Sequence, residues 1–178
     1  MHCNTLKIKT MKNIGIFYGS LTGNTESAAK QIQKELGADV AKIFDTASAK
    51  ASDIEQFSNL IFASSTWNDG DMEEDFEDFL PEISSADLKG KKVAIFGCGD
   101  QDSYPDTFVD AIGEIYEAIK EKGCDIVGMV PTDGYDFEES KAMVDGKFVG
   151  LPLDEENQGN LTGDRIKTWV NQLKTEFD

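Results

Sequence analysis

The chain has 178 residues and a formal net charge of −17, because 34 Asp and Glu residues stand against 17 Lys and Arg residues. Its length suits one domain with a sizeable core. Its charge argues against binding to nucleic acid or anionic lipid and favours basic partner proteins. No apolar run approaches the roughly 20 residues of a membrane span, so no membrane insertion is expected. The single histidine, His2, argues against a histidine-based catalytic or metal site.

The N-terminus lacks the apolar segment of a secretory signal. We therefore expect residues 1–11 to be a flexible extension and residues 12–178 to form a single domain. Cys3, Cys98 and Cys124 form no CxxC pair. Free thiols indicate a reducing compartment, which would be the cytoplasm or, in a eukaryotic alga, the plastid stroma.

Short apolar runs alternate with amphipathic helical periods along the chain. The expected elements are a strand at 13–18, a helix ending at Gly37, a strand at 38–44, a short helix around Ile54, strands at 59–64 and 91–97, a helix ending at Gly123, a strand at 125–130 and a last helix containing Trp169. Such alternation predicts a doubly wound α/β fold, with a five-stranded parallel sheet covered by helices on both faces.

Ligands of such sheets bind beyond the carboxyl ends of the strands, where the strand order reverses. Three loops leave these ends in the predicted sheet, at 19–25, 64–71 and 97–104. We expect a ligand site where these three loops meet.

The first loop lies in the stretch GSLTGNTES at 19–27. This stretch differs from the nucleotide-binding pattern GxxxxGK[ST]. Gly19 and Gly23 are one residue too close, and Asn24 stands where the lysine belongs. The pattern GxGxxG is also absent, which argues against a pyrophosphate dinucleotide. Backbone N–H groups at a helix N-terminus, together with Ser and Thr hydroxyls, suit one compact terminal phosphate. An ordinary Ser/Thr-rich helix cap is the alternative.

Each of the other two loops contains an aromatic residue in a polar setting. Trp67 stands between Thr66 and the turn sequence Asn-Asp-Gly, and Tyr104 directly precedes Pro105, the expected first residue of a helix. Trp169 instead fits the apolar stripe of the last helix and is expected in the core. A planar ring between two aromatic side chains, with one phosphate on a tail, describes flavin mononucleotide (FMN).

These stretches together resemble the flavodoxin family. Residues 16–32 (IFYGSLTGNTESAAKQI) resemble its signature, 65–71 (STWNDGD) its first aromatic flavin loop, and 96–113 (FGCGDQDSYPDTFVDAIG) its second. Residues 131–158 are similar to the insertion that splits the last strand in long-chain flavodoxins, with 131–149 as its main part. The resemblance implies the strand order 2-1-3-4-5, with FMN at the switch point.

The resemblance also implies a set of cofactor-binding residues. The phosphate would be bound by Ser20, Leu21, Thr22, Gly23, Asn24 and Thr25. The two faces of the flavin ring would be covered by Trp67 and Tyr104. The ring edges would be lined by Thr66, Asn68, Asp69, Gly70, Cys98, Gly99, Asp100 and Gln101. Cys98 and the sequence Asp102-Ser103 depart from the usual family residues, and Asp69 adds a carboxylate, so a family redox potential does not transfer.

The implied function is one-electron transfer by a monomeric FMN protein that is not an enzyme. Its implied partners are basic redox proteins, such as a ferredoxin/flavodoxin-NADP reductase and an electron-acceptor complex. The stretch 68–78, with seven carboxylates in eleven residues, would face these partners or would simply be a solvated surface.

Two alternatives have the same architecture. A receiver domain would need an aspartate at the end of strand three and a lysine at the end of strand five, where this chain has Ser64-Ser65-Thr66 and Val130-Pro131. An FMN-dependent NAD(P)H:quinone reductase is closer, but Arg165, the single arginine, offers little to hold a nicotinamide phosphate.

Overall fold

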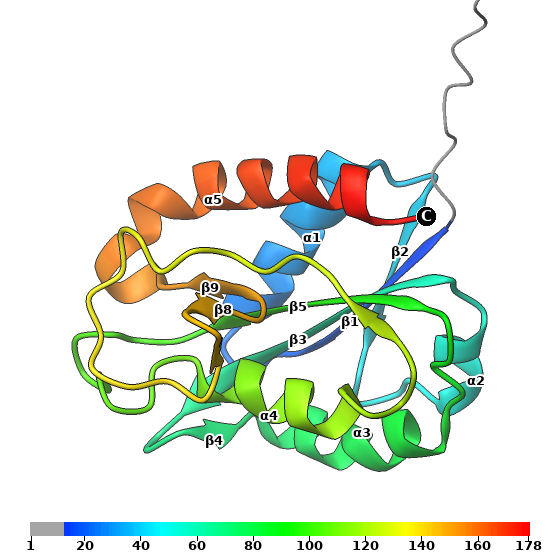
Figure 1. The fold of residues 1–178 in the computed structure, drawn as a ribbon, viewed down its shortest axis with the longest axis horizontal. Coiled ribbons are helices and arrows are strands. Elements are labelled where there is room, and N and C mark those ends of the chain that lie inside the picture. The colour runs from blue at the N-terminus through cyan, green and yellow to red at the C-terminus, as the bar shows by residue number, and fades with distance from the viewer. Residues whose placement is uncertain (1–12) are drawn as a thin grey trace, which may run out of the picture.

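A computed structural model describes residues 13–178, and Figure 1 shows its fold. The predicted extension at 1–11, with His2 and Cys3, lies outside the described residues. Within the described part of the chain, no helix has both the length and the apolar character needed to cross a bilayer.

The described elements follow the predicted alternation of strands and helices. In chain order they are β1 (Ile14–Gly19), α1 (Asn24–Leu36), β2 (Ala41–Asp45), α2 (Ala51–Glu55), β3 (Asn59–Trp67), β4 (Asp71–Met72), α3 (Glu74–Ser85), β5 (Lys92–Cys98), α4 (Asp110–Ile119), β6 (Asp125–Ile126), β7 (Met143–Val144), β8 (Lys147–Phe148), β9 (Leu151–Leu153) and α5 (Glu155–Glu176).

Five parallel strands form the sheet in the order β2-β1-β3-β5-β6, which confirms the order that the resemblance implied. Two short strands share the last position of the sheet, because both β6 and β9 pair with β5. Asp125 faces Lys92 near the start of β5, whereas Leu153 faces Cys98 at its end. The predicted split of the last strand is therefore confirmed. The regular strand expected over 125–130 is shorter, since Gly128 has a φ of 78° and turns the chain away.

Helices cover both faces of the sheet, with α1 and α5 on one side and α3 and α4 on the other (Figure 1). The strands are buried on both faces, and β1 and β3 are almost entirely inaccessible to solvent. Helix α1 ends at Gly37, as predicted, where a φ of 106° is available to glycine at little cost.

Helix α3 was not expected from the sequence. Phe76, Phe79 and Ile83 are buried at positions i, i+3 and i+7, while most of the acidic residues between them face solvent. The side chain of Glu73 caps the helix by accepting a hydrogen bond from the backbone N–H of Phe76 (3.1 Å). The acidic stretch therefore belongs partly to an amphipathic helix whose apolar residues fill the core.

The prediction that Pro105 begins a helix is wrong, because α4 begins at Asp110. The carbonyl of Pro105 accepts hydrogen bonds from the backbone N–H groups of Glu138 (2.9 Å) and Glu139 (3.0 Å). Val109 then takes a left-handed conformation with a φ of 49°. Contacts with a distant segment thus hold residues 105–109 in turns and delay the helix.

Candidate functional site

A pocket of about 380 Å³ lies where β1, β3 and β5 end, at the edge of the sheet predicted to bind a ligand. All three predicted loops contribute to its wall, and the first turn of α5 completes it. The pocket is lined by Thr22, Asn24, Ser65, Thr66, Trp67, Asn68, Cys98, Gly99, Asp100, Tyr104, Glu155 and Glu156.

The loop between β1 and α1 is shaped by its own side chains and by one glycine. Gly23 precedes α1 with a φ of 91°, a left-handed conformation that needs glycine. Its backbone N–H donates to the Ser20 hydroxyl (3.0 Å), so the loop is closed before any ligand arrives. No side chain of residues 13–178 caps α1, so the N–H groups of its first turn are available to an anion.

A hairpin between β3 and β4 positions Trp67. Trp67 pairs with Asp71 across the hairpin, and the turn between them uses Asn68 (φ 46°) and Gly70 (φ 104°). The Trp67 indole Nε1 is buried and has no hydrogen-bond partner in the structure. A buried indole N–H ordinarily donates to an acceptor. Since Trp67 lines the pocket, this donor fits a ligand that brings oxygen atoms.

The third loop presents Tyr104, whose side chain is 41% exposed. Its backbone N–H donates to the carbonyl of Asp100 (3.0 Å), which closes a tight turn. Partial burial raises the pKa of Asp100, but hydrogen bonds from Ser103, Asn157 and Asp102 outweigh that effect and hold the pKa below its ordinary value. An ionised Asp100 therefore organises the turn from within.

Small polar side chains lie at the pocket wall and directly beneath it. The hydroxyls of Thr25 and Ser65 lie 2.6 Å apart and share a hydrogen bond, and both residues are buried. Burial raises the pKa of the neighbouring Cys98 thiol to about 12, although a hydrogen bond with Thr25 acts in the opposite direction. Cys98 is thus a neutral, unreactive thiol at neutral pH.

The structure brings nine of the sixteen predicted residues to the pocket wall and leaves the others around it. The seven that do not line it are Ser20, Leu21, Gly23, Thr25, Asp69, Gly70 and Gln101. Thr25 and Gln101 are buried beneath their loops, whereas Leu21 is 77% exposed. The residues missed by sequence reasoning are Ser65, Glu155 and Glu156.

An acidic hollow of about 740 Å³ adjoins the pocket and shares Trp67 and Asn68 with it. The exposed Leu21 stands at its edge. Its acidic lining residues are Asp71, Glu73, Glu74, Asp75, Glu77 and Glu114. The carboxylates of the acidic stretch therefore surround one side of the candidate site.

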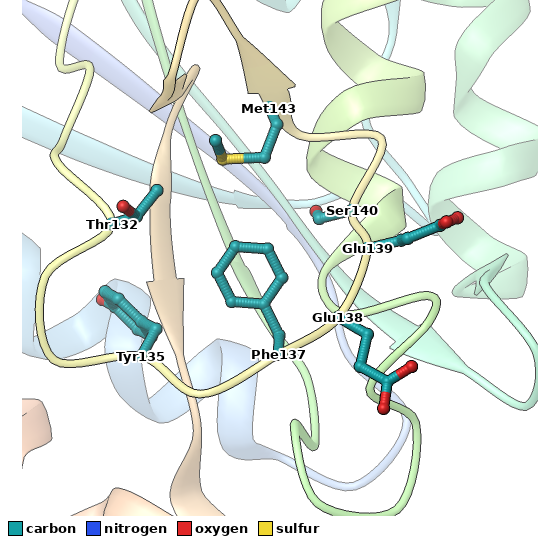
Figure 2. Close-up of a pocket in the computed structure, with 7 residues that line it drawn as sticks. All are labelled: Thr132, Tyr135, Phe137, Glu138, Glu139, Ser140 and Met143. Atoms are coloured by element: carbon teal, nitrogen blue, oxygen red, sulfur yellow. The ribbon is translucent and has the colours of Figure 1, made fainter.

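A separate hollow of about 550 Å³ lies in the segment between β6 and β9 (Figure 2). The ring of Phe137 stands between Tyr135 and Met143 in this view, and the Glu138 carboxylate points away from them. Phe137 also packs on Phe148, with ring centroids 5.1 Å apart. This hollow contains none of the predicted site residues.

The order of the parallel strands and the pocket at their carboxyl ends define a doubly wound α/β protein with a flavodoxin-like fold. The family model for flavodoxin matches residues 16–169. A flavodoxin from a Nostoc species is 51% identical over 166 residues, which cover 93% of this chain and 98% of that protein. Flavodoxin 1 from Escherichia coli K12 is 47% identical over 164 residues, covering 92% and 93% of the two chains.

Solved structures show the same relationship. The crystal structure of Fusobacterium nucleatum flavodoxin bound to flavin mononucleotide superposes with a TM-score of 0.90 at 38% identity, covering 94% of this chain and all of that one. The chain belongs to the flavodoxin family.

Proposed function

We propose that this protein is a one-electron carrier that uses non-covalently bound FMN and shuttles electrons between redox proteins. The observation that carries the proposal is the pocket where a cation-free helix N-terminus meets two aromatic residues, Trp67 and Tyr104. A relative in the same family, from Fusobacterium nucleatum, is bound to flavin mononucleotide. The unpartnered indole N–H of Trp67 fits the same ligand, since FMN has many oxygen atoms.

The residues present would divide the binding of FMN between them. The backbone N–H groups at the start of α1 and the hydroxyl of Thr22 would hold the phosphate. Trp67 and Tyr104 would cover the ring and keep water away from it. When bound, FMN supplies the redox chemistry, and the protein sets its potential by charge, hydrogen bonds and exposure.

Binding can be tested by titrating the apoprotein with FMN while the visible absorption and flavin fluorescence are recorded. We expect one FMN per chain, with the flavin fluorescence quenched by the adjacent aromatic rings. Unchanged fluorescence at micromolar FMN and protein would contradict the proposal.

The phosphate assignment predicts a selective effect of Thr22→Val. This change removes one hydroxyl from the pocket wall and should weaken FMN binding by about 1–3 kcal/mol, since the lost hydrogen bond is to a charged group. Riboflavin, which lacks the phosphate, is the matched control and should bind the variant and the parent almost equally. Equal losses for the two ligands would place the phosphate elsewhere.

We propose that the acidic surface beside Trp67 receives the basic partners and lowers the more negative of the two flavin potentials. The exposed Asp69, Asp71 and Glu74 are the groups to change. Glu73 is unsuitable, because it is buried and caps α3; burial also raises its pKa despite hydrogen bonds from Phe76 and Asp75.

The triple variant Asp69→Asn, Asp71→Asn, Glu74→Gln should raise the more negative potential by tens of millivolts at low salt. It should also exchange electrons more slowly with a basic reductase, because electrostatic steering is weaker. Both differences should shrink at high salt, where screening is stronger. Spectroelectrochemistry and stopped-flow kinetics at two ionic strengths measure the potential and the rate. If the variant had the potential and the rate of the parent protein at low salt, the acidic stretch would be a solvated surface only.

We also propose that the protein acts as a monomer in the cytoplasm. The two cysteines in the described residues, Cys98 and Cys124, are both free, which fits a reducing compartment.

A further inference from the structure

The loop that includes Tyr104 is held by a buried carboxylate from a distant part of the chain. Asp154 lies between β9 and α5 and is inaccessible to solvent. Its Oδ2 accepts a hydrogen bond from the backbone N–H of Gln101 (3.1 Å). Its Oδ1 accepts from the backbone N–H of Asn157 (3.0 Å), so the same side chain caps the first turn of α5. One carboxylate therefore joins the pocket loop to the helix.

The side chain of Asn157 reinforces this connection. Its amide Nδ2 donates to both oxygens of Asp154 (3.1 and 3.0 Å) and to Oδ1 of Asp100 (2.8 Å). A buried carboxylate without a cation needs several donors, and here the donors are all amide N–H groups. Each of these donors belongs to a residue of the loop or of α5, so the carboxylate of Asp154 connects the two segments.

Gln101 is held from its other side as well. Its Oε1 accepts a hydrogen bond from the backbone N–H of Asp136 (2.6 Å), which lies in sequence between two residues that line the separate hollow, Tyr135 and Phe137. Gln101 is 2% exposed, and both its backbone N–H and its side-chain oxygen form hydrogen bonds within the protein. In this structure Gln101 is held by contacts inside the protein, and its place at the edge of the flavin ring stays a prediction.

We infer that Asp154 is a positioning residue for the flavin ring, acting through the loop that contains Gly99, Asp100 and Tyr104. The inference rests on the proposed binding of FMN. Asp154 does not line the pocket, whereas these three loop residues do. Fixing the loop in advance removes an ordering cost that binding would otherwise incur.

The test is Asp154→Asn. Asparagine is as good a helix cap as aspartate, but its amide has one acceptor oxygen and cannot serve both Asn157 and Gln101. We expect the dissociation constants of FMN and riboflavin to rise by the same factor, about ten-fold, because the loop faces the ring that the two ligands share. Thr22→Val should instead act on FMN alone, which separates the two ends of the site.

One control variant and one second test variant separate positioning from general stability. Asp53→Asn changes a carboxylate that accepts the backbone N–H of Lys50 (2.8 Å) at the start of α2, and it should leave both dissociation constants unchanged. Asn157→Ala removes the exposed amide and should raise the dissociation constants of both ligands about three- to five-fold. This variant tests the inference if Asp154→Asn fails to fold.

The inference would be overturned if a folded Asp154→Asn variant bound FMN and riboflavin as tightly as the parent protein. If only Asn157→Ala folds, the same result in that variant would overturn it. A loss confined to FMN would also overturn it, because Asp154 would then act at the phosphate. Failure of the parent protein to bind FMN would refute the proposed function itself, and that outcome is distinct from both.

Discussion

Replacing Trp67 with alanine is expected to weaken FMN binding by about 1–3 kcal/mol and to release flavin fluorescence, by analogy with aromatic side chains that stack on nucleic-acid bases. Trp67 is placed by the β3–β4 hairpin, and its indole Nε1 lacks a partner although it is buried. The alanine variant therefore loses a ring surface and a donor at once. Trp67→Phe keeps a ring without the donor and should lose less affinity.

Tyr104→Ala should reduce affinity by a similar amount, since Tyr104 lines the same pocket from another loop. Isothermal titration calorimetry gives the affinities, and flavin fluorescence reports the loss of stacking. If Trp67→Ala bound FMN as tightly as the parent protein and quenched flavin fluorescence as strongly, Trp67 would not stack on the flavin ring.

Trp169→Ala should lower the free energy of unfolding by about 3–5 kcal/mol, the usual cost of deleting a large buried aromatic side chain. Trp169 is 1% exposed and contacts Phe96 edge to face, with ring centroids 6.1 Å apart. Its Nε1 donates to the carbonyl of Gly128 (2.8 Å), which would lose this partner. Urea unfolding of the apoprotein measures the change.

The two tryptophans should thus have opposite signatures. Trp169→Ala should leave the FMN affinity of the folded fraction unchanged, because Trp169 is not in the wall of the pocket proposed to bind FMN. Trp169→Phe, which keeps a ring, should lose less stability. A stable Trp169→Ala with impaired FMN binding would reverse the roles assigned to the two side chains.

Local patterns were sufficient to predict β1, β2, β3 and β5, helix α1 and the three loops of the site. The period of Ala29, Ile32 and Leu36 and the stop at Gly37 lie within one short stretch, so no tertiary information was needed. Trp67 stood out because it is an aromatic residue among turn-forming residues, although the structure has it as the last residue of β3 and not in the turn itself.

The features that the sequence did not predict depend on contacts between distant segments. Gln101 is fixed by Asp136 and Asp154, which are 35 and 53 residues further along the chain. Glu155 and Glu156 reach the pocket because β9 pairs with the end of β5. Helix α3 was missed for another reason, since its acidic residues and the internal Pro81 obscure the period of its buried side chains.

The central claim, a one-electron carrier, is tested most directly by stepwise anaerobic reduction of the FMN-loaded protein, followed by visible and electron paramagnetic resonance spectra. We expect two separate one-electron steps, with an unpaired-electron signal between them, and slow reduction by NADPH unless a reductase is added. The one arginine, Arg165, has its guanidinium carbon 4.0 Å from the centroid of the Tyr135 ring and does not line the pocket proposed to bind FMN. A single two-electron step with rapid direct oxidation of NADPH would contradict the account.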